Sequence, residues 1–409
     1  MGRAERWTVA MALGALAGCN CQAPTDAPNS KVPSNCQSSA PLVRPVTTDI
    51  LFVVDDSNSM AEEQAGVAAE LPAFVEELSK GGGVTQDFQV AVTTTSVYEA
   101  SEFNGSLTLR NYPEGGWLKL MPTLDGGVST QRYLPSTDPE LVPRFSQLVA
   151  SLGISGSGQE TPFEAARIAL TGQDFNRLLP DGGNPNAGFL RDGARLLVVA
   201  VSDEDDCSER VRPPVVRFND VDGQDFCTLH EDLLTPVGDY YTLLQNLPDG
   251  TGRQREVLWA AIAPVARSNK IAQGVEGALG DGGTVIQNVD CPTSAGPGYR
   301  HRAMATAFDP SAQNLSSICD ASYHQALVDI ATVAGASQTL ELDTNVPDPA
   351  LLQITITRVD GGTDVCTVAN GGISYEAGVD GGSPRVHFHG DCLRRTSDTA
   401  VTIRLFCAG

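Results

Sequence analysis

The sequence predicts an α/β protein with a doubly wound, mainly parallel central sheet flanked by helices, followed by a small all-β domain. Apolar runs such as ILFVV at 50–54 are typical of strands buried on both faces. Helical patterns alternate with these runs along the chain. From Val346 onwards the runs become short and alternating, with Gly-rich turns between them, which is typical of antiparallel sheet.

The first eighteen residues have the features of an export signal. Two arginines precede an apolar stretch that is too short to span a bilayer. Residues 16–19, LAGC, resemble a bacterial lipobox, which implies that the Cys19 thiol takes a diacylglycerol, with palmitate-type acyl chains, before cleavage. A secretory signal that contains a cysteine by chance is the alternative. One acylated terminus would anchor the protein to a membrane without spanning it.

The residue after Cys19 bears on the expected location. In Gram-negative lipoproteins an Asp at this place tends to mark retention in the inner membrane, and this chain has Asn20. The resemblance therefore implies an exported protein anchored to the cell envelope, at the outer membrane.

Composition then divides the rest of the chain. Residues 19–48 are rich in Pro, Ser, Asn, Thr and Gln, so they cannot bury enough apolar surface to fold and are expected to form a flexible tether. We therefore expect a signal at 1–18, the tether at 19–48, an α/β domain at 49–345 and a β domain at 346–409.

The expected α/β domain begins with the strand DILFVV at 49–54. A helix from about Met60 to Ser79 follows, and the glycines at 81–83 end it. Further strands are expected at 88–95, 195–202, 256–264 and 338–342, the last closing the sheet, and further helices at 139–153, 162–170, 231–247 and 321–336. Residues 96–135, 204–230 and 265–320 are expected to be long insertions near the carboxyl ends of the strands.

The formal net charge of −23 limits the partners. An acidic surface repels phosphate backbones, so no nucleic acid is expected to bind. Cations and basic surfaces are attracted instead.

Ten cysteines agree with an exported protein. If Cys19 is acylated, an odd number remains, so at least one is unpaired or pairs between chains. Sequence order suggests two disulfides that each close an insertion, and a third in the tail. The expected pairs are Cys207 with Cys227, Cys291 with Cys319, and two of Cys366, Cys392 and Cys407.

Polar side chains follow three of the predicted elements. Asp55, Ser57 and Ser59 come after the first strand, Thr161 lies in a Gly-rich loop that enters a helix, and Asp203 follows the strand at 195–202. Loops at the carboxyl ends of neighbouring parallel strands meet at one crevice. We therefore expect these five side chains to meet around one ion.

This pattern resembles the von Willebrand factor A domain, a Rossmann-like fold, with its metal-ion-dependent adhesion site, over roughly residues 49–345. The resemblance implies that Ser57 and Ser59 bind Mg²⁺ or Mn²⁺ directly and that Thr161 binds directly or through water. It also implies that Asp55 and Asp203 act mostly through water. Neutral hydroxyl ligands leave much of the metal's charge unquenched, so that it can take a carboxylate from a protein partner.

Two acidic segments and a histidine pair leave alternatives open. Residues 203–206 with Glu209 form a solvated acidic loop or hold a second cation, Ca²⁺. The segment 219–226 echoes a calcium loop but lacks its closing Glu. His387 and His389 are surface histidines or zinc ligands.

Asp56 adds a charge beside the expected site. It is interpreted as a solvated turn residue, or as a cap for the helix that starts near Met60.

The expected function is a lipid-anchored, divalent-metal-dependent protein-binding or adhesion module of the bacterial envelope. The alternatives are an envelope scaffold with a vestigial metal site and a metal-assisted hydrolase. The chain has no nucleophile elbow, HExxH motif or recognisable Ser/His/Asp set, so we expect no enzyme.

Overall fold

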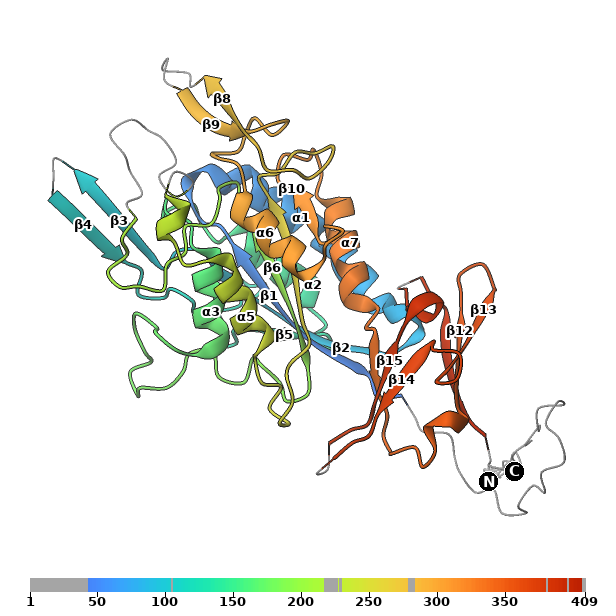
Figure 1. The fold of residues 1–409 in the computed structure, drawn as a ribbon. Helices are drawn as coiled ribbons and strands as arrows, with labels where there is room; N and C mark the ends of the chain where they lie inside the picture. The colour runs from blue at the N-terminus through green and yellow to red at the C-terminus, as the bar shows by residue number, and fades with distance from the viewer. Residues whose placement is uncertain are drawn as a thin grey trace, which may run out of the picture.

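The computed structural model describes residues 43–103, 106–216, 227, 230–278, 284–379, 382–395 and 397–406. Its centre is a six-stranded sheet in the order β10-β7-β6-β1-β2-β5 (Figure 1). Neighbouring strands pair parallel, except that the short edge strand β5 is antiparallel to β2. The mainly parallel sheet is therefore confirmed. The strands are β1 Val46–Val54, β2 Gln86–Thr94, β5 Leu134–Pro135, β6 Arg195–Val201, β7 Val257–Ala263 and β10 Leu315–Ser317.

Helices cover both faces of this sheet, because alternate residues of its buried strands point to opposite sides. Ile50, Phe52 and Val54 pack with α1, α2 and α7, whereas Leu51 and Val53 pack with α3, α5 and α6. The helices are α1 Ala61–Lys80, α2 Leu141–Ala150, α3 Pro162–Thr171, α5 Val237–Gln245, α6 Tyr299–Phe308 and α7 His324–Gly335.

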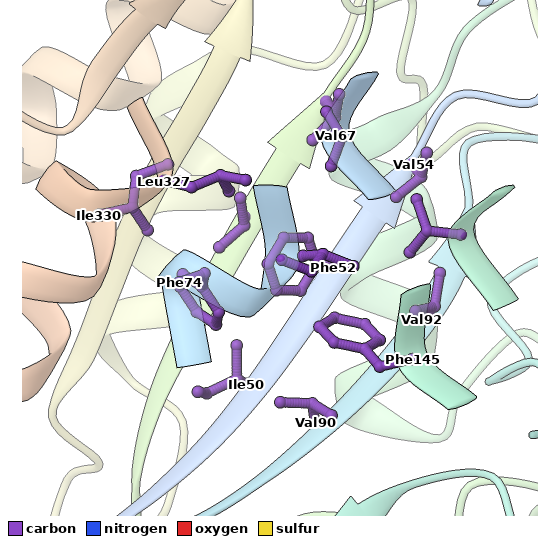
Figure 2. Packing of buried hydrophobic residues seen from close by; sticks show 14 of the residues in the cluster. Ile50, Phe52, Val54, Val67, Phe74, Val90, Val92, Phe145, Leu327 and Ile330 are labelled. Carbon is purple, nitrogen blue, oxygen red and sulfur yellow. The ribbon is translucent and has the colours of Figure 1, made fainter. Parts of the chain in front are cut away.

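Phe52 lies at the centre of the first of these two cores (Figure 2). Its ring makes edge contacts with Phe74 of α1 and Phe145 of α2, at centroid distances of 5.4 and 5.2 Å. Such edge-to-face pairs add to the free energy of burial. This packing fixes the middle of the sheet and hence the position of the loop that follows β1.

Two hairpins extend from the sheet. β3 (Tyr98–Phe103) pairs with β4 (Ser106–Asn111), and β8 (Gly274–Ala278) pairs with β9 (Thr284–Asn288), both antiparallel. Figure 1 shows both at the end of the molecule away from the C-terminal strands.

The C-terminal part forms two antiparallel three-stranded sheets around their own core, in the orders β11-β15-β14 and β13-β12-β16. The small β region is therefore present, and we call it the β unit. Its strands are β11 Thr339–Glu341, β12 Leu352–Thr357, β13 Thr363–Thr367, β14 Ile373–Glu376, β15 Arg385–Phe388 and β16 Ala400–Leu405.

Three expected boundaries differ from the structure. β11 was expected to close the central sheet, but it pairs with β15, since its one fully buried side chain, Leu340, belongs to the core of the β unit. The chain also joins the fold before residue 49, because β1 starts at Val46 and Val43 bridges to Leu342. The expected insertions at 96–135 and 265–320 contain β5 and, respectively, α6 with β10, which belong to the α/β layers.

Three disulfides are present in the described residues. Cys207–Cys227 and Cys291–Cys319 are the expected pairs, and the tail pair is Cys366–Cys392. Cys19 and Cys407 lie outside the described residues.

No helix of the described chain has the length and apolarity needed to cross a membrane.

Arg394 attaches the β unit to the α/β layers. Its guanidinium donates to the carbonyl oxygens of Gly81, Gly82 and Ser337 at 2.9, 3.1 and 2.9 Å. Gly81 and Gly82 have φ of 59° and 58°, a left-handed conformation that suits glycine and ends α1. A cation is favourable here, because the last carbonyls of a helix carry partial negative charge.

Candidate metal centre

Asp55 is the first polar residue after β1, and it is fully buried. Its Oδ1 accepts a hydrogen bond from the Ser57 amide at 2.8 Å, and its Oδ2 accepts one from the Ser202 hydroxyl at 2.6 Å. Gln64 of α1 donates to the Asp55 carbonyl at 2.8 Å. These contacts fix the loop at 55–59 against the end of β6.

The hydroxyls of Ser57 and Ser59 lie together. Their Oγ atoms are 3.0 Å apart, and Ser59 Oγ donates to Asp203 Oδ1 at 3.1 Å. Asp203 follows β6, the strand that pairs with β1. The structure thus places Asp55, Ser57, Ser59 and Asp203 in one cluster, as the convergence of strand ends requires.

Thr161 joins this cluster through a neighbouring strand. Its hydroxyl donates to the carbonyl oxygen of Thr95 at 2.5 Å, and the Thr95 amide donates to the Val54 carbonyl at 3.3 Å. The Thr161 oxygen keeps its lone pairs, so it remains able to act as a ligand. No hydrogen bond joins Thr161 to the other four residues in the described structure.

Glu160 is a residue that the sequence interpretation missed. Its side chain is only 1% exposed, and it accepts a hydrogen bond from the Thr95 hydroxyl through Oε2. The only local signal was an acidic residue next to Thr161 in a Gly-rich loop. Nothing in the sequence showed that this residue is buried.

Burial changes the acidity of this cluster. It raises the pKa of Asp55 to about 6, although hydrogen bonds from Ser202 and Ser57 oppose the shift. Burial and then the charge of Asp55 raise the pKa of Asp203 to about 8, and they raise that of Glu160 well above its usual value. The strongest charge effects on these three carboxyls come from other carboxylates. A cation placed here would offset that repulsion.

The donor set suits a small, hard divalent cation. Mg²⁺ and Mn²⁺ prefer oxygen ligands, and hydroxyl and carboxylate oxygens meet at this end of the sheet. In the part of the chain that the structure describes, no group of three or more His, Cys, Asp or Glu could hold a metal ion. A cation at this place would therefore depend on the hydroxyls of Ser57, Ser59 and Thr161.

Asp56 is not the solvated turn residue or helix cap that we expected. It is 8% exposed, and its Oδ1 accepts a hydrogen bond from Ser96 Oγ at 2.7 Å. Its carbonyl accepts one from the Gly156 amide at 2.8 Å. Asp56 therefore joins the loops after β1 and β2 to the loop before α3.

The acidic loop after β6 is also not solvated. Asp206 pairs with Arg300 of α6 at 2.9 Å, and Asp205 accepts from the Arg300 amide at 3.0 Å. Glu209 accepts from the amides of Val215 and Val216, both at 2.8 Å. These contacts hold the loop rigidly beside Asp203. A calcium ion at this loop stays a prediction.

The remaining candidates lie away from the cluster. His387 contacts Thr339 and Glu376, at 3.0 and 3.4 Å, and His389 contacts Ser374 at 2.9 Å, all in the β unit. The segment 219–226 lies outside the described residues.

The topology agrees with the resemblance drawn from the sequence. The mainly parallel sheet with helices on both faces fits an α/β fold of the von Willebrand factor A type. No protein-family model matches the chain. No curated protein matches it either.

Solved structures that match part of this chain include a von Willebrand factor type A protein from Catenulispora acidiphila, at 12% identity and a TM-score of 0.32. The match covers 88% of this chain and 56% of that one. Proximal thread matrix protein 1 from the mussel byssus has 14% identity and a TM-score of 0.23, over 55% of this chain and 39% of that one.

The pilus adhesin SpaC from Lactobacillus rhamnosus GG, in an open conformation, has 11% identity and a TM-score of 0.28. The match covers 86% of this chain and 38% of that one. The chain thus spans about half the length of these proteins or less. At this level of similarity, the matched structures do not indicate the function of this chain.

Proposed function

We propose that this protein is a binding module that holds a divalent cation at the carboxyl ends of β1 and β6 and captures a partner carboxylate. The observation that carries the proposal is the meeting of Ser57, Ser59 and Asp203. When bound, Mg²⁺ or Mn²⁺ would supply an electrophilic position for an oxygen of the partner. The chain's residues would hold and orient the cation.

Each residue would have a distinct role. Ser57 and Ser59 would offer neutral oxygens, which leave much of the cation's charge available to a partner. Asp55 and Asp203 would act mostly through water, since both already accept hydrogen bonds from the loop serines or Ser202. Thr161 would complete the set from the loop before α3.

The place at which Arg44 joins the fold is compatible with an N-terminal anchor. The Arg44 amide donates to the carbonyl oxygen of Glu341 in the β unit at 2.9 Å, at the end of β1 opposite to Asp55. A lipid on Cys19, carried by a tether of the expected length, would join the fold at the end of β1 opposite to the cluster. We include attachment to the outer membrane in the proposal, as the residues around Cys19 imply.

The proposal is tested by calorimetric titration of Mg²⁺ and Mn²⁺ into the purified full-length protein and its Ser57→Ala/Ser59→Ala variant. We expect binding by the wild type and a loss of more than about 100-fold in affinity in the variant, since two oxygen ligands are removed. The variant should keep the thermal stability of the metal-free wild type, because neither side chain belongs to the hydrophobic cores. A wild type that binds neither cation would overturn the proposal in favour of an envelope scaffold.

A further inference from the structure

Glu160 lies two residues before the start of α3 and is almost wholly shielded from solvent, with 1% exposure. Its Oε2 accepts a hydrogen bond from the Thr95 hydroxyl. Its Oε1 is buried and has no hydrogen-bond partner in the described structure. A buried carboxylate oxygen without a partner loses its hydration without compensation, which is unfavourable.

Thr95 contacts both Glu160 and the candidate ligand Thr161. The Thr95 carbonyl accepts from both the amide and the hydroxyl of Thr161, at 3.3 and 2.5 Å, while the Thr95 hydroxyl holds Glu160. Thr95, the residue directly after β2, therefore orients both the Thr161 hydroxyl and the Glu160 carboxylate. The charges that act on Glu160 most strongly are those of Asp55 and Glu204, both negative.

A second buried glutamate shows how this fold satisfies such a group elsewhere. Glu164 of α3 is also fully buried, but Arg167 donates to both of its oxygens, at 2.8 and 2.9 Å. Arg212 donates at 2.7 Å and Tyr240 at 3.1 Å. Arginine side chains thus neutralise Glu164, whereas Oε1 of Glu160, four residues earlier in the chain, has no partner in the described structure.

We infer that Glu160 is a further residue of the metal site and supplies an anionic oxygen to the divalent cation. The inference rests on the proposed function. It adds a carboxylate to a set otherwise dominated by neutral hydroxyls, so the site holds its cation more tightly before a partner arrives. A hard cation such as Mg²⁺ or Mn²⁺ fits this oxygen-only set.

The test uses Glu160→Gln, because the amide keeps an acceptor for Thr95 but loses the negative charge. Calorimetric titration of the full-length protein with Mg²⁺ and Mn²⁺ should show an affinity at least about 10-fold lower than that of the wild type. In EDTA, the variant should unfold at about the temperature of the wild type, since the amide still accepts the hydrogen bond from the Thr95 hydroxyl. A merely structural role would lower the unfolding temperature and leave the affinity unchanged.

Glu99→Gln is the matched control. It removes the same charge from β3, but the Glu99 carboxylate accepts hydrogen bonds from the Gly158 amide at 3.3 Å and the Tyr112 hydroxyl at 3.5 Å. We expect its affinity for both cations to match the wild type.

The outcomes separate the two proposals. If Ser57→Ala/Ser59→Ala loses binding but Glu160→Gln binds as the wild type does, the role of Glu160 is overturned and the proposed function stands. If both variants are weakened and Glu99→Gln is not, both proposals are supported. If the wild type binds neither cation, both are overturned.

Discussion

The hydroxyl of Ser59 donates a hydrogen bond to Asp203 at 3.1 Å, although 144 positions separate the two residues in the chain. The contact forms because β1 and β6 are parallel neighbours, which brings their carboxyl ends to the same edge of the sheet. It joins the two loops on which a divalent cation would depend.

We expect Ser202 to position the Asp55 carboxylate at the candidate metal centre. It donates to Asp55 Oδ2 at 2.6 Å, so Ser202→Ala leaves that oxygen without its donor. We expect a 10- to 100-fold loss of Mg²⁺ affinity by calorimetry, the usual effect of removing a group that orients a metal-site residue. Ser146→Ala is the control, because the Ser146 hydroxyl has no partner in the described structure. Equal affinities in the two variants would contradict this role.

The stability of the metal-free protein should depend on pH. The pKa of Asp203 is raised to about 8, so the folded state binds a proton that the unfolded chain, with a pKa near 3.8, has released. The stabilisation is complete below the unfolded pKa and is lost as pH rises through 8. Between pH 6.5 and 8.5 the loss is on the order of 2 kcal/mol for this group.

Thermal unfolding in EDTA at these two pH values measures the effect. Saturating Mg²⁺ should remove most of the difference, because cation binding favours the ionised carboxylates. Burial also lowers the pKa of His301 to about 4. The neutral imidazole therefore stabilises the fold above pH 6.5, and this contribution is lost only as the pH falls below 6.5, outside the range between these two pH values. A protein that gains stability between pH 6.5 and 8.5 without metal would contradict the assignment.

The Cys207–Cys227 disulfide should support the metal site. The Cys207 amide donates to the Glu160 carbonyl at 2.7 Å, and the Tyr98 hydroxyl donates to the Cys207 carbonyl at 3.1 Å. Cys207→Ser/Cys227→Ser should therefore lower Mg²⁺ affinity about 10-fold, as well as stability by about 2–4 kcal/mol.

The second disulfide provides the control for this prediction. Cys366→Ser/Cys392→Ser should cost a similar amount of stability, but this pair lies in the core of the β unit, so Mg²⁺ affinity should stay unchanged. If calorimetry shows the same loss of affinity in both double variants, the effect is one of general stability.

Arg394 should hold the β unit against the end of α1. Burial lowers its pKa to about 10, and three backbone carbonyls accept from its guanidinium. Arg394→Met should reduce the free energy of unfolding by about 2–4 kcal/mol, since these carbonyls lose a charged donor. Hydrogen exchange should become faster at Gly81–Gly83 and in the β unit.

The neighbouring Arg395 is the control for this variant. Its side chain is exposed, so Arg395→Met should change neither the unfolding free energy nor the exchange rates. Mg²⁺ affinity should be unaffected in both variants, because the junction lies at the opposite end of β1 from Asp55.

The sequence by itself determined the central strands β1, β2, β6 and β7, the helix at 61–80 and the polar residues that follow β1. The reason is local: an unbroken apolar run such as ILFVV has to be buried on both faces, and apolar residues at helical spacing form one face of a helix. Sequence order was also enough for the pairs Cys207–Cys227 and Cys291–Cys319, because each closes one loop.

Only the tertiary structure decided which polar groups are buried and what they contact. In the sequence Asp56 looks like a turn residue, but in the structure the hydroxyl of Ser96, forty positions away, donates a hydrogen bond to its carboxylate. Glu160 and Glu164 are both buried glutamates, yet one has a free oxygen and the other is satisfied by two arginines. β11 has the pattern of a strand, but it pairs with β15 and not with the central sheet because Leu340 packs in the core of the β unit. Local patterns report which face of an element is apolar, whereas the partners of a polar side chain come from residues that only folding brings near.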